Sequence, residues 1–324
     1  EVTWHLVPGL DLTGGLRYTH EKKDGSFGQV QRGPALTETE ILFGAQAIRD
    51  AFAPNIATFL ARTKENNLSG RATIAYHLTP DVMAYVTYAR GFKSGGLNLN
   101  PTTAPRVIAP EKVQSIEAGL KTQFLDRRLT LNLTAFTQRV RNYQTQQIDT
   151  RVAQTAYIAN VGTVRSRGFE LDASLRPARG VSLFAAASYT DASYRSFVNA
   201  PCPVEYLGIE TVCNLSGRRL PGVSRYSVSA GGEYALDIGP SRQLYLNADY
   251  AYRSNFYTTY NLAADSLAPG YGVTNARLGL RSANGGWDIS LYARNLFNSH
   301  YINIINPSAF NTGQSTAMLG DPRT

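Results

Sequence analysis

Histidine and cysteine are the side chains most able to supply acid–base, nucleophilic or metal chemistry, and this chain contains few of either. Its four histidines, His5, His20, His77 and His300, are scattered without the spacing of a metal site or of a Ser/His/acid grouping. No phosphate-cradling glycine motif is followed by a helix-like segment. We therefore expect no catalytic site, no cofactor and no metal site. An enzyme that assembles its site from distant strands remains an alternative with little support.

The two cysteines, Cys202 and Cys213, lie close together in a segment rich in Pro, Gly and Asn. This spacing suits one disulfide that staples a loop in an oxidising compartment. Two unpaired thiols in a cytosolic loop remain the alternative.

The composition narrows the fold class. The chain has 324 residues and 43% hydrophobic content, and no run reaches the roughly 18–20 apolar residues that a spanning helix requires. A helical membrane protein is therefore excluded. Nineteen tyrosines and 28 glycines favour strands and turns, so the chain is expected to be all-β.

The charge balance is basic, with 32 Lys and Arg against 24 Asp and Glu, which gives a formal net charge of +8. Such a balance fits a nucleic acid, an anionic membrane surface or an anionic ligand. The basic residues are spread over the whole length, with no cluster beside an aromatic stacking platform, so we expect no nucleic-acid partner.

Many segments alternate strictly between apolar and polar residues, which indicates strands with two different environments. Leu244–Arg253 (LYLNADYAYR) is one of them: its even positions are apolar or aromatic, whereas Asn247, Asp249 and Arg253 are odd. A slip by one residue would turn those polar groups toward the apolar medium, where a basic group costs about 2–4 kcal/mol near a bilayer midplane. The register is therefore fixed.

The length and the connections of these segments distinguish a membrane barrel from a soluble sandwich. About ten residues at roughly 3.3 Å each, tilted about 40°, cover the ~25 Å apolar band of an outer membrane. Short links rich in turn-forming residues, such as Val7–Gly9 and Ala283–Gly286, alternate along the chain with longer links. The longer links lie near 23–65, 94–110, 196–221, 257–270 and 302–321. This arrangement predicts a transmembrane antiparallel β-barrel of which the chain supplies about twelve strands, the last running from Trp287 to Tyr301.

Tyrosines gather near the expected strand ends, at Tyr85, Tyr88, Tyr189, Tyr194, Tyr250, Tyr252 and Tyr257. They favour an interfacial girdle, and ordinary cross-strand aromatic packing is the alternative.

Five phrases resemble barrel strands of the TonB-dependent outer-membrane receptors. They are Gly15–Thr19 (GLRYT), Tyr88–Gly96 (YARGFKSGG), Pro110–Lys121 (PEKVQSIEAGLK), Asn160–Leu171 (NVGTVRSRGFEL) and Ala293–Asn298 (ARNLFN), in the family's usual order. Together they extend across nearly the whole chain.

The resemblance implies a barrel of about 22 strands with an N-terminal plug. Residues 1–324 would then be the C-terminal portion of the barrel, without the plug and the first strands. It also implies localisation in the outer membrane of a Gram-negative bacterium. The implied partners are TonB with its inner-membrane energising complex, outer-membrane lipid and lipopolysaccharide, and a small-molecule ligand on a monomeric barrel.

One segment, 35–62, breaks the β pattern. Ile41, Ala45, Ile48 and Phe52 recur at helical spacing, and Thr37 with Glu40 forms a capping box. Pro54 is expected to interrupt the helix before Ile56 and Leu60. We expect a helical extracellular loop, either a lid over ligand or a rigid cover.

Amides, aromatics and a cation near the extracellular strand ends could hold a large polar ligand by hydrogen bonds and stacking. The candidate ligand contacts are Lys93, Asn98, Asn142, Gln144, Gln146, Asn160, Asn255, Tyr257 and Tyr260.

The resemblance implies active uptake of a scarce nutrient, most commonly a ferric siderophore, with energy from TonB. Iron would be coordinated by the siderophore itself. The alternatives are a passive porin-type channel, a structural or adhesive barrel, and a TonB-dependent receptor for cobalamin, a glycan or an aromatic compound.

Overall fold

The computed structural model describes residues 1–324 except 102–103, 150–154, 207–208, 211 and 308–313. It is dominated by one 12-stranded antiparallel sheet in which each strand pairs with its neighbours in chain order. The strands are β1 (Val2–Val7), β2 (Leu10–Gln29), β3 (Ile56–Thr79), β4 (Val82–Lys93), β7 (Glu111–Phe124), β8 (Leu129–Asp149), β9 (Thr155–Leu175), β10 (Val181–Ser196), β13 (Tyr226–Ile238), β14 (Arg242–Arg253), β17 (Tyr271–Ser282) and β18 (Asp288–Ala293). The expected antiparallel barrel fold, with about twelve strands from this chain, is confirmed.

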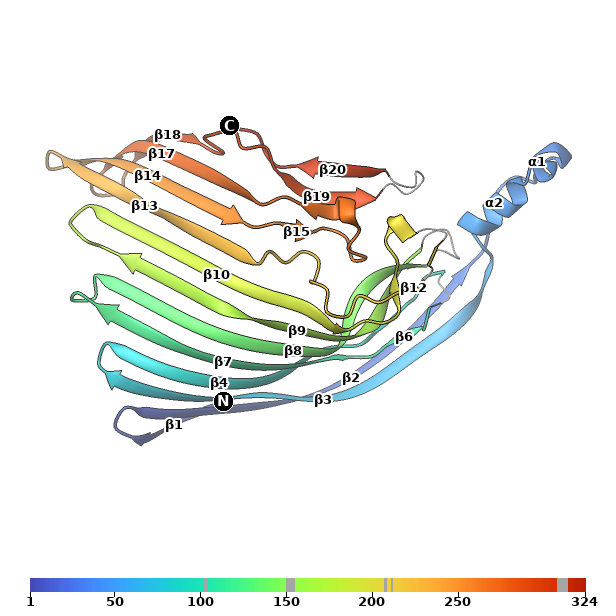
Figure 1. The fold of residues 1–324 in the computed structure, drawn as a ribbon, viewed down its shortest axis with the longest axis horizontal. Helices are drawn as coiled ribbons and strands as arrows, with labels where there is room; N and C mark the ends of the chain where they lie inside the picture. Colours follow the sequence, from blue (N-terminus) through green and yellow to red (C-terminus); the bar gives the residue numbers. More distant parts are fainter. Residues whose placement is uncertain (102–103, 150–154, 207–208, 211, 308–313) are drawn as a thin grey trace.

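The connections fall into two classes at opposite ends of the sheet (Figure 1). The predicted short turns gather at one end, where β1–β2, β3–β4, β7–β8, β9–β10, β13–β14 and β17–β18 are joined. The other end, called here the loop end, carries the helices and four two-stranded hairpins. These hairpins are β5 (Gly96–Leu97) with β6 (Val107–Ile108), β11 (Ala200–Pro201) with β12 (Val212–Cys213), β15 (Phe256–Tyr257) with β16 (Leu267–Ala268), and β19 (Ile302–Pro307) with β20 (Ser315–Leu319).

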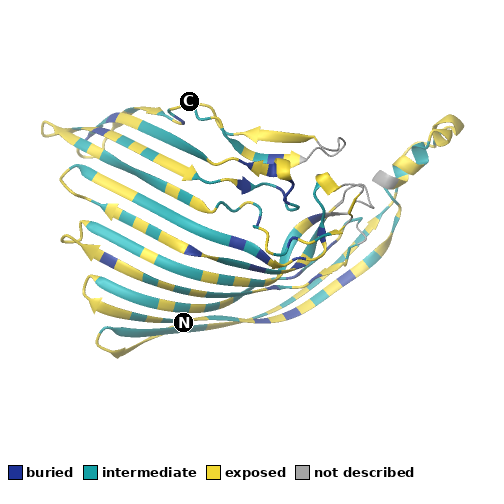
Figure 2. Ribbon diagram, in the orientation of Figure 1, coloured by how far each residue is buried: buried dark blue, intermediate teal, exposed yellow. Residues whose placement is uncertain are grey.

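Exposure alternates along the strands, as the banding in Figure 2 shows. In β14 the even residues Leu246 and Tyr250 are exposed, whereas Tyr245 is only 3% exposed. Aliphatic side chains are exposed on the same face of other strands, including Leu16 at 81% and Ile74 at 55%. We call this face the outer wall and the opposite face the inner wall. Apolar groups that point away from all other protein atoms fit contact with hydrocarbon.

The inner wall is polar and its side chains bond to one another across strands. The Tyr245 hydroxyl donates to Asp288 Oδ1 at 2.9 Å, and the Arg277 guanidinium donates to the same oxygen at 3.1 Å. The Tyr245 ring lies over Gly279, where a Cβ atom would come within 2.5 Å of the ring. The inward charges therefore stabilise the wall through cross-strand pairs.

The segment between β2 and β3 contains two short helices, α1 (Glu38–Leu42) and α2 (Ala45–Phe52). The predicted capping box is confirmed, because the Thr37 hydroxyl accepts from the Glu40 backbone N–H and the Glu40 carboxylate accepts from the Thr37 N–H. Gly44 has φ +79°, which breaks the helix between the two pieces. None of the helices in the described part of the chain has the length and apolar character needed to cross a membrane.

Two predicted boundaries were wrong. Ile56 and Leu60 belong to β3, because the backbone after Pro54 pairs with β2 from Gln29 onward and leaves only 30–55 as the connection. The last strand of the 12-stranded sheet, β18, ends at Ala293 and does not continue to Tyr301. Asn295 has φ +49° and donates its amide to the Ser299 and Asp321 carbonyls, so this asparagine turns the chain out of the sheet.

The tyrosine girdle was predicted too broadly. Of the predicted tyrosines, Tyr88, Tyr250 and Tyr252 lie on the outer wall at 45%, 43% and 37% exposure. Tyr85 lies on the inner wall, where its hydroxyl donates to Glu117 at 2.6 Å, and Tyr194 is buried in a hydrophobic cluster. Tyrosine suits both walls, because its ring tolerates burial and its hydroxyl binds polar groups.

Candidate functional site at the loop end

The β5–β6 hairpin is fixed to β9 by two of the predicted amides. Asn98 donates its Nδ2 to the Ile158 carbonyl at 3.0 Å and accepts from the Ile158 N–H at 3.1 Å, and it is buried. Asn160 forms a similar pair of bonds with the backbone of Ala109, at 2.7 and 2.8 Å. These two amides therefore hold protein backbone at the loop end.

Two more predicted residues, Gln144 and Asn142, bind the backbone on either side of the β5–β6 hairpin. Gln144 donates to the carbonyls of Ser94 and Ala109, both at 3.0 Å, and Asn142 donates to the Pro110 carbonyl at 3.5 Å. Lys93 is 61% exposed and its Nζ lies 3.6 Å from the buried carboxylate of Glu111. Lys93 therefore keeps a cationic group open to solvent.

A polar cluster on β2 and β3 fixes Ser94 and Gly95, and sequence reasoning missed it. Ser94 donates its hydroxyl to Glu21, Lys23 donates to the Gly95 carbonyl at 2.5 Å, and the Gly95 N–H donates to Glu65 at 3.0 Å. The hydrogen bonds from Ser94 and Lys23 lower the pKa of Glu21. Gly95 is required because a Cβ atom there would collide with the Ile108 carbonyl.

A hydrophobic cluster lies beside this hairpin and joins β9 and β10 to the loops at 197–225 and 258–266. Its buried members are Val161, Val164, Ala192, Tyr194, Phe197, Ala200, Leu215, Leu220 and Leu262. Tyr194 is 1% exposed and its ring packs against Phe197 with centroids 5.1 Å apart. The loop end is therefore packed in the manner of a soluble protein core.

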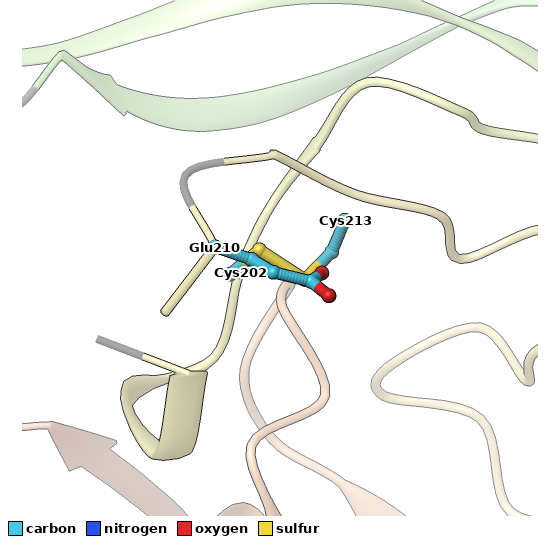
Figure 3. Close-up of side chains that lie close together, drawn as sticks. All are labelled: Cys202, Glu210 and Cys213. Carbon is cyan, nitrogen blue, oxygen red and sulfur yellow. A yellow bond between two sulfur atoms is a disulfide. The ribbon is translucent and has the colours of Figure 1, made fainter. Parts of the chain in front are cut away.

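The loop at 197–225 is closed by a disulfide between Cys202 and Cys213 (Figure 3). The Glu210 carboxylate lies beside it, 3.7 Å from the Cys213 sulfur. Cys202, Glu210 and Cys213 are the one group among the described residues with the geometry of a metal site. Sulfurs joined in a disulfide are not thiolates, so this group does not fit a metal ion.

The remaining predicted contacts line the neighbouring strand ends. Asn255 is exposed and its Oδ1 accepts from Arg219 at 3.3 Å. Tyr257 is half-buried against the hydrophobic cluster. Tyr260 is also partly buried, and this burial raises the pKa of its hydroxyl. Gln146 is exposed, and its side chain forms no hydrogen bond to the described residues.

The inner wall below these loops contains a hollow of about 630 Å³ that spans β8 to β17. Asn132, Glu170 and Asp172 line one side, and Arg253 and Tyr271 line the other. The hollow offers hydrogen-bond donors and acceptors of both charges, which suits binding of polar groups. No histidine or cysteine is among these lining residues.

The chain matches the family model described as "TonB dependent receptor-like, beta-barrel" over residues 1–296. The catecholate siderophore receptor Fiu of Escherichia coli is 25% identical over 342 aligned residues, which cover 99% of this chain and 39% of Fiu. The pesticin receptor of Yersinia pestis is 27% identical over 185 residues, or 56% of this chain and 24% of that receptor.

The fold is shared with solved structures. The ferric yersiniabactin uptake receptor FyuA from Yersinia pestis superposes with a TM-score of 0.75 at 21% identity, covering 99% of this chain and 43% of FyuA. The siderophore receptor PiuA from Acinetobacter baumannii gives a TM-score of 0.69 at 19% identity, covering 99% and 40% of the two chains.

The chain therefore spans less than half the length of these relatives. Members of this family are receptors and transporters of the Gram-negative outer membrane. The family match, the alternating strands and the alternation of short turns with long loops agree, and the chain belongs to the family of TonB-dependent receptor β-barrels.

Proposed function

We propose that this chain is the C-terminal barrel portion of an outer-membrane receptor that imports a ferric siderophore with energy from TonB. The observation that carries the proposal is the family match over residues 1–296, together with a catecholate siderophore receptor that aligns with 99% of the chain. In this proposal iron is cargo, coordinated by the siderophore, and the protein supplies the recognition surface.

The open sheet supports a barrel that is completed by further strands of the same receptor. Strands β1 and β18 each have a single neighbour in the described sheet. Open backbone edges are not tolerated in hydrocarbon, because lipid cannot pair their N–H and C=O groups. We propose that additional strands close the cylinder to about 22, and that a plug domain fills its lumen.

Within the candidate site, the groups with free capacity are the proposed ligand contacts. Lys93 supplies a cation, Gln146 an amide that is not hydrogen-bonded to the described residues, and Tyr257 and Tyr260 aromatic surface. Asn255 is a weaker candidate since Arg219 occupies its oxygen. Asn98, Asn142, Gln144 and Asn160 are proposed to act indirectly, by holding the β5–β6 hairpin in place.

Uptake measurements test this function. A strain lacking the intact receptor is complemented with it and supplied with radiolabelled iron bound to catecholate, mixed-ligand or hydroxamate siderophores, with and without TonB. The proposal expects receptor-dependent uptake of at least one ferric siderophore that disappears without TonB. Receptor-dependent uptake that persists without TonB would instead identify a passive channel. TonB-dependent growth on cobalamin or a glycan, with no iron uptake, would reassign the cargo.

A further inference from the structure

Two acidic residues lie directly opposite one another on the long arm that β2 and β3 form at the loop end (Figure 1). Glu21 pairs with Glu65 in the register, so both side chains lie on the same face of this arm. The start of the β5–β6 hairpin covers that face, and Glu65 is only 8% exposed. Two ionised carboxylates in this position would repel each other, and burial would strengthen the repulsion because the local dielectric constant is low.

A single proton between the two carboxyl groups would remove this repulsion. The side chain of Glu65 lies close enough to hydrogen-bond to the carboxylate of Glu21. Such a bond requires one of the two groups to be protonated, because ionised carboxylates only accept hydrogen bonds. Two carboxyl groups that share a site bind their first proton more readily than an isolated carboxylate does.

The surroundings of the pair leave one negative charge unbalanced. Lys23 lies on the same face of β2, and its Nζ is 3.0 Å from a carboxylate oxygen of Glu21. On β4 and β7, Lys93 and Glu111 pair with each other at 3.6 Å and so neutralise one another. The other residues next to the pair on this face are uncharged: Thr19 on β2, and Thr63 and Asn67 on β3. Lys23 balances one carboxylate, and a proton is needed for the second.

The pair binds the first residues of the β5–β6 hairpin. Ser94 donates its hydroxyl to Glu21, and the Gly95 N–H donates to Glu65 at 3.0 Å. Lys23 donates to the Gly95 carbonyl at 2.5 Å and so closes a ring of polar contacts around the start of the hairpin. The charge of the pair therefore acts directly on the backbone at Ser94 and Gly95.

The same hairpin joins two long extensions of the sheet. Leu99 packs against Gly25 of β2, where a Cβ atom would come within 2.5 Å of the leucine side chain. The Arg106 guanidinium lies 3.8 Å from the centre of the Phe59 ring of β3. On the other side, Asn98 bonds to the backbone of β9. Movement at the start of the hairpin would therefore be transmitted across the loop end.

We propose that Glu21 and Glu65 share a proton that closes a latch between the β2–β3 arm and the β5–β6 hairpin. With the proton bound, the pair carries one negative charge, which Lys23 balances, and the hairpin is held. Without the proton, the two carboxylates repel each other and the contacts with Ser94 and Gly95 weaken. This inference concerns the order of the loops and does not depend on the transported cargo.

The pH dependence of this latch has a defined direction. The closed hairpin binds the shared proton more tightly than the open one, so closure is favoured as the pH falls from about 8 to about 5. The hydrogen bonds from Ser94 and Lys23 lower the pKa of Glu21, so this carboxylate stays ionised in that range. Its own contribution is lost only when the pH falls further, through the lowered pKa. The hairpin should therefore be most firmly closed in mildly acid solution.

Hydrogen exchange of the amides in 95–108 tests the latch in the intact receptor in lipid vesicles. Rates are corrected for the intrinsic pH dependence of exchange and referred to the amides of β13 and β14. We expect protection of the wild-type hairpin to rise about tenfold between about pH 8 and about pH 5, as for a proton affinity that differs by one pKa unit between the two states. Glu65→Gln should remove this response and keep the hairpin protected at both pH values, because the neutral amide accepts from Gly95 and donates to Glu21.

A matched control and a spectroscopic measurement make the result decisive. Asp24→Asn removes a carboxylate from the opposite face of β2, where it pairs with Lys22 and Arg62, and should keep the wild-type pH response. Infrared spectra at about pH 5 should show a buried protonated carboxyl group in the wild type and in Asp24→Asn, and not in Glu65→Gln.

The wild-type exchange and infrared data test the proposal without any substitution. Equal hairpin protection of the wild type at both pH values, or the lack of the protonated carboxyl band, would overturn it. A pH response that survives in Glu65→Gln, or one that is lost in Asp24→Asn, would also overturn it, because the response would then arise from other groups.

Discussion

The outer wall of the strands and the loop end obey opposite packing rules. On the outer wall aliphatic side chains are highly exposed, as at Leu16 and Leu291, which are 81% and 80% exposed. At the loop end the aliphatic and aromatic side chains are inside, and Tyr194 and Ala200 are each 1% exposed. The difference shows that two solvents act on one sheet: hydrocarbon surrounds the strands, and water surrounds the loops.

The largest effect is expected from emptying the core of the loop end. Tyr194→Ala should destabilise the hydrophobic cluster by about 3–5 kcal/mol, because a fully buried ring leaves a cavity. Hydrogen exchange should then accelerate in 197–225 and leave the amides of β13 and β14 protected. Acceleration throughout the sheet would show that the two regions are not separate packing units.

A matched variant at the same residue sharpens this result. The Tyr194 hydroxyl is buried and has no hydrogen-bond partner among the described residues. Tyr194→Phe should therefore leave stability equal or slightly higher, because no bond is lost and an unsatisfied polar group is removed. A large loss of stability would indicate a partner for this hydroxyl in the native protein.

The next largest effect compares the same substitution on the outer and the inner wall of one strand, β8. Leu133 lies on the outer wall of β8, and Asn132 lies on the inner wall beside Asp172, to which its amide donates at 3.2 Å. Leu133→Arg should cost about 2–4 kcal/mol in lipid. Asn132→Arg should stay within about 0.5 kcal/mol of the wild type, since this side chain lies on the polar inner wall between Asp172 on β9 and Lys121 on β7. Urea unfolding of the intact receptor in vesicles measures both, and equal costs would refute the assignment of walls.

Reduction of the disulfide should have a smaller and more local effect. Opening the link between Cys202 and Cys213 should remove roughly 2–3 kcal/mol of loop stability, as expected for a short closed loop. Limited proteolysis should then cut within 203–212, and Cys202→Ser with Cys213→Ser should reproduce the reduced protein. Unchanged protease resistance would show that the hydrophobic cluster alone holds this loop.

The smallest effect is a pH dependence in the helical loop. The backbone N–H and the hydroxyl of Thr37 lower the pKa of Glu40, so the folded helix favours the ionised carboxylate. This stabilisation is present at neutral pH and is lost as the pH falls through the lowered pKa. NMR of α1 should show fraying only under acid, and Glu40→Gln should remove most of the pH response. Fraying of the wild type near neutrality would contradict the capping assignment.

The sequence predicted the strands well because their alternation is local. Leu246 faces outward for the same reason as Leu244, and no distant contact is needed to infer it. The loop end was less predictable, since Asn98 and Gln144 bond to backbone that lies far away in the chain. Glu65 was missed because 23–65 lacks apolar alternation, although Phe27 and Phe59, whose rings lie 5.9 Å apart, mark the two arms of that hairpin.

The central claim is that the outer wall contacts hydrocarbon and the inner wall contacts water. A scan of nitroxide spin labels along β14 tests this claim most directly. Single cysteines replace residues 246–251 in turn in the membrane-embedded receptor, while Cys202 and Cys213 stay joined in the disulfide. We predict that spin labels at even positions are accessible to oxygen and that labels at odd positions are accessible to a water-soluble nickel complex, with a period of two. Equal accessibility at neighbouring positions, or the opposite parity, would contradict the account.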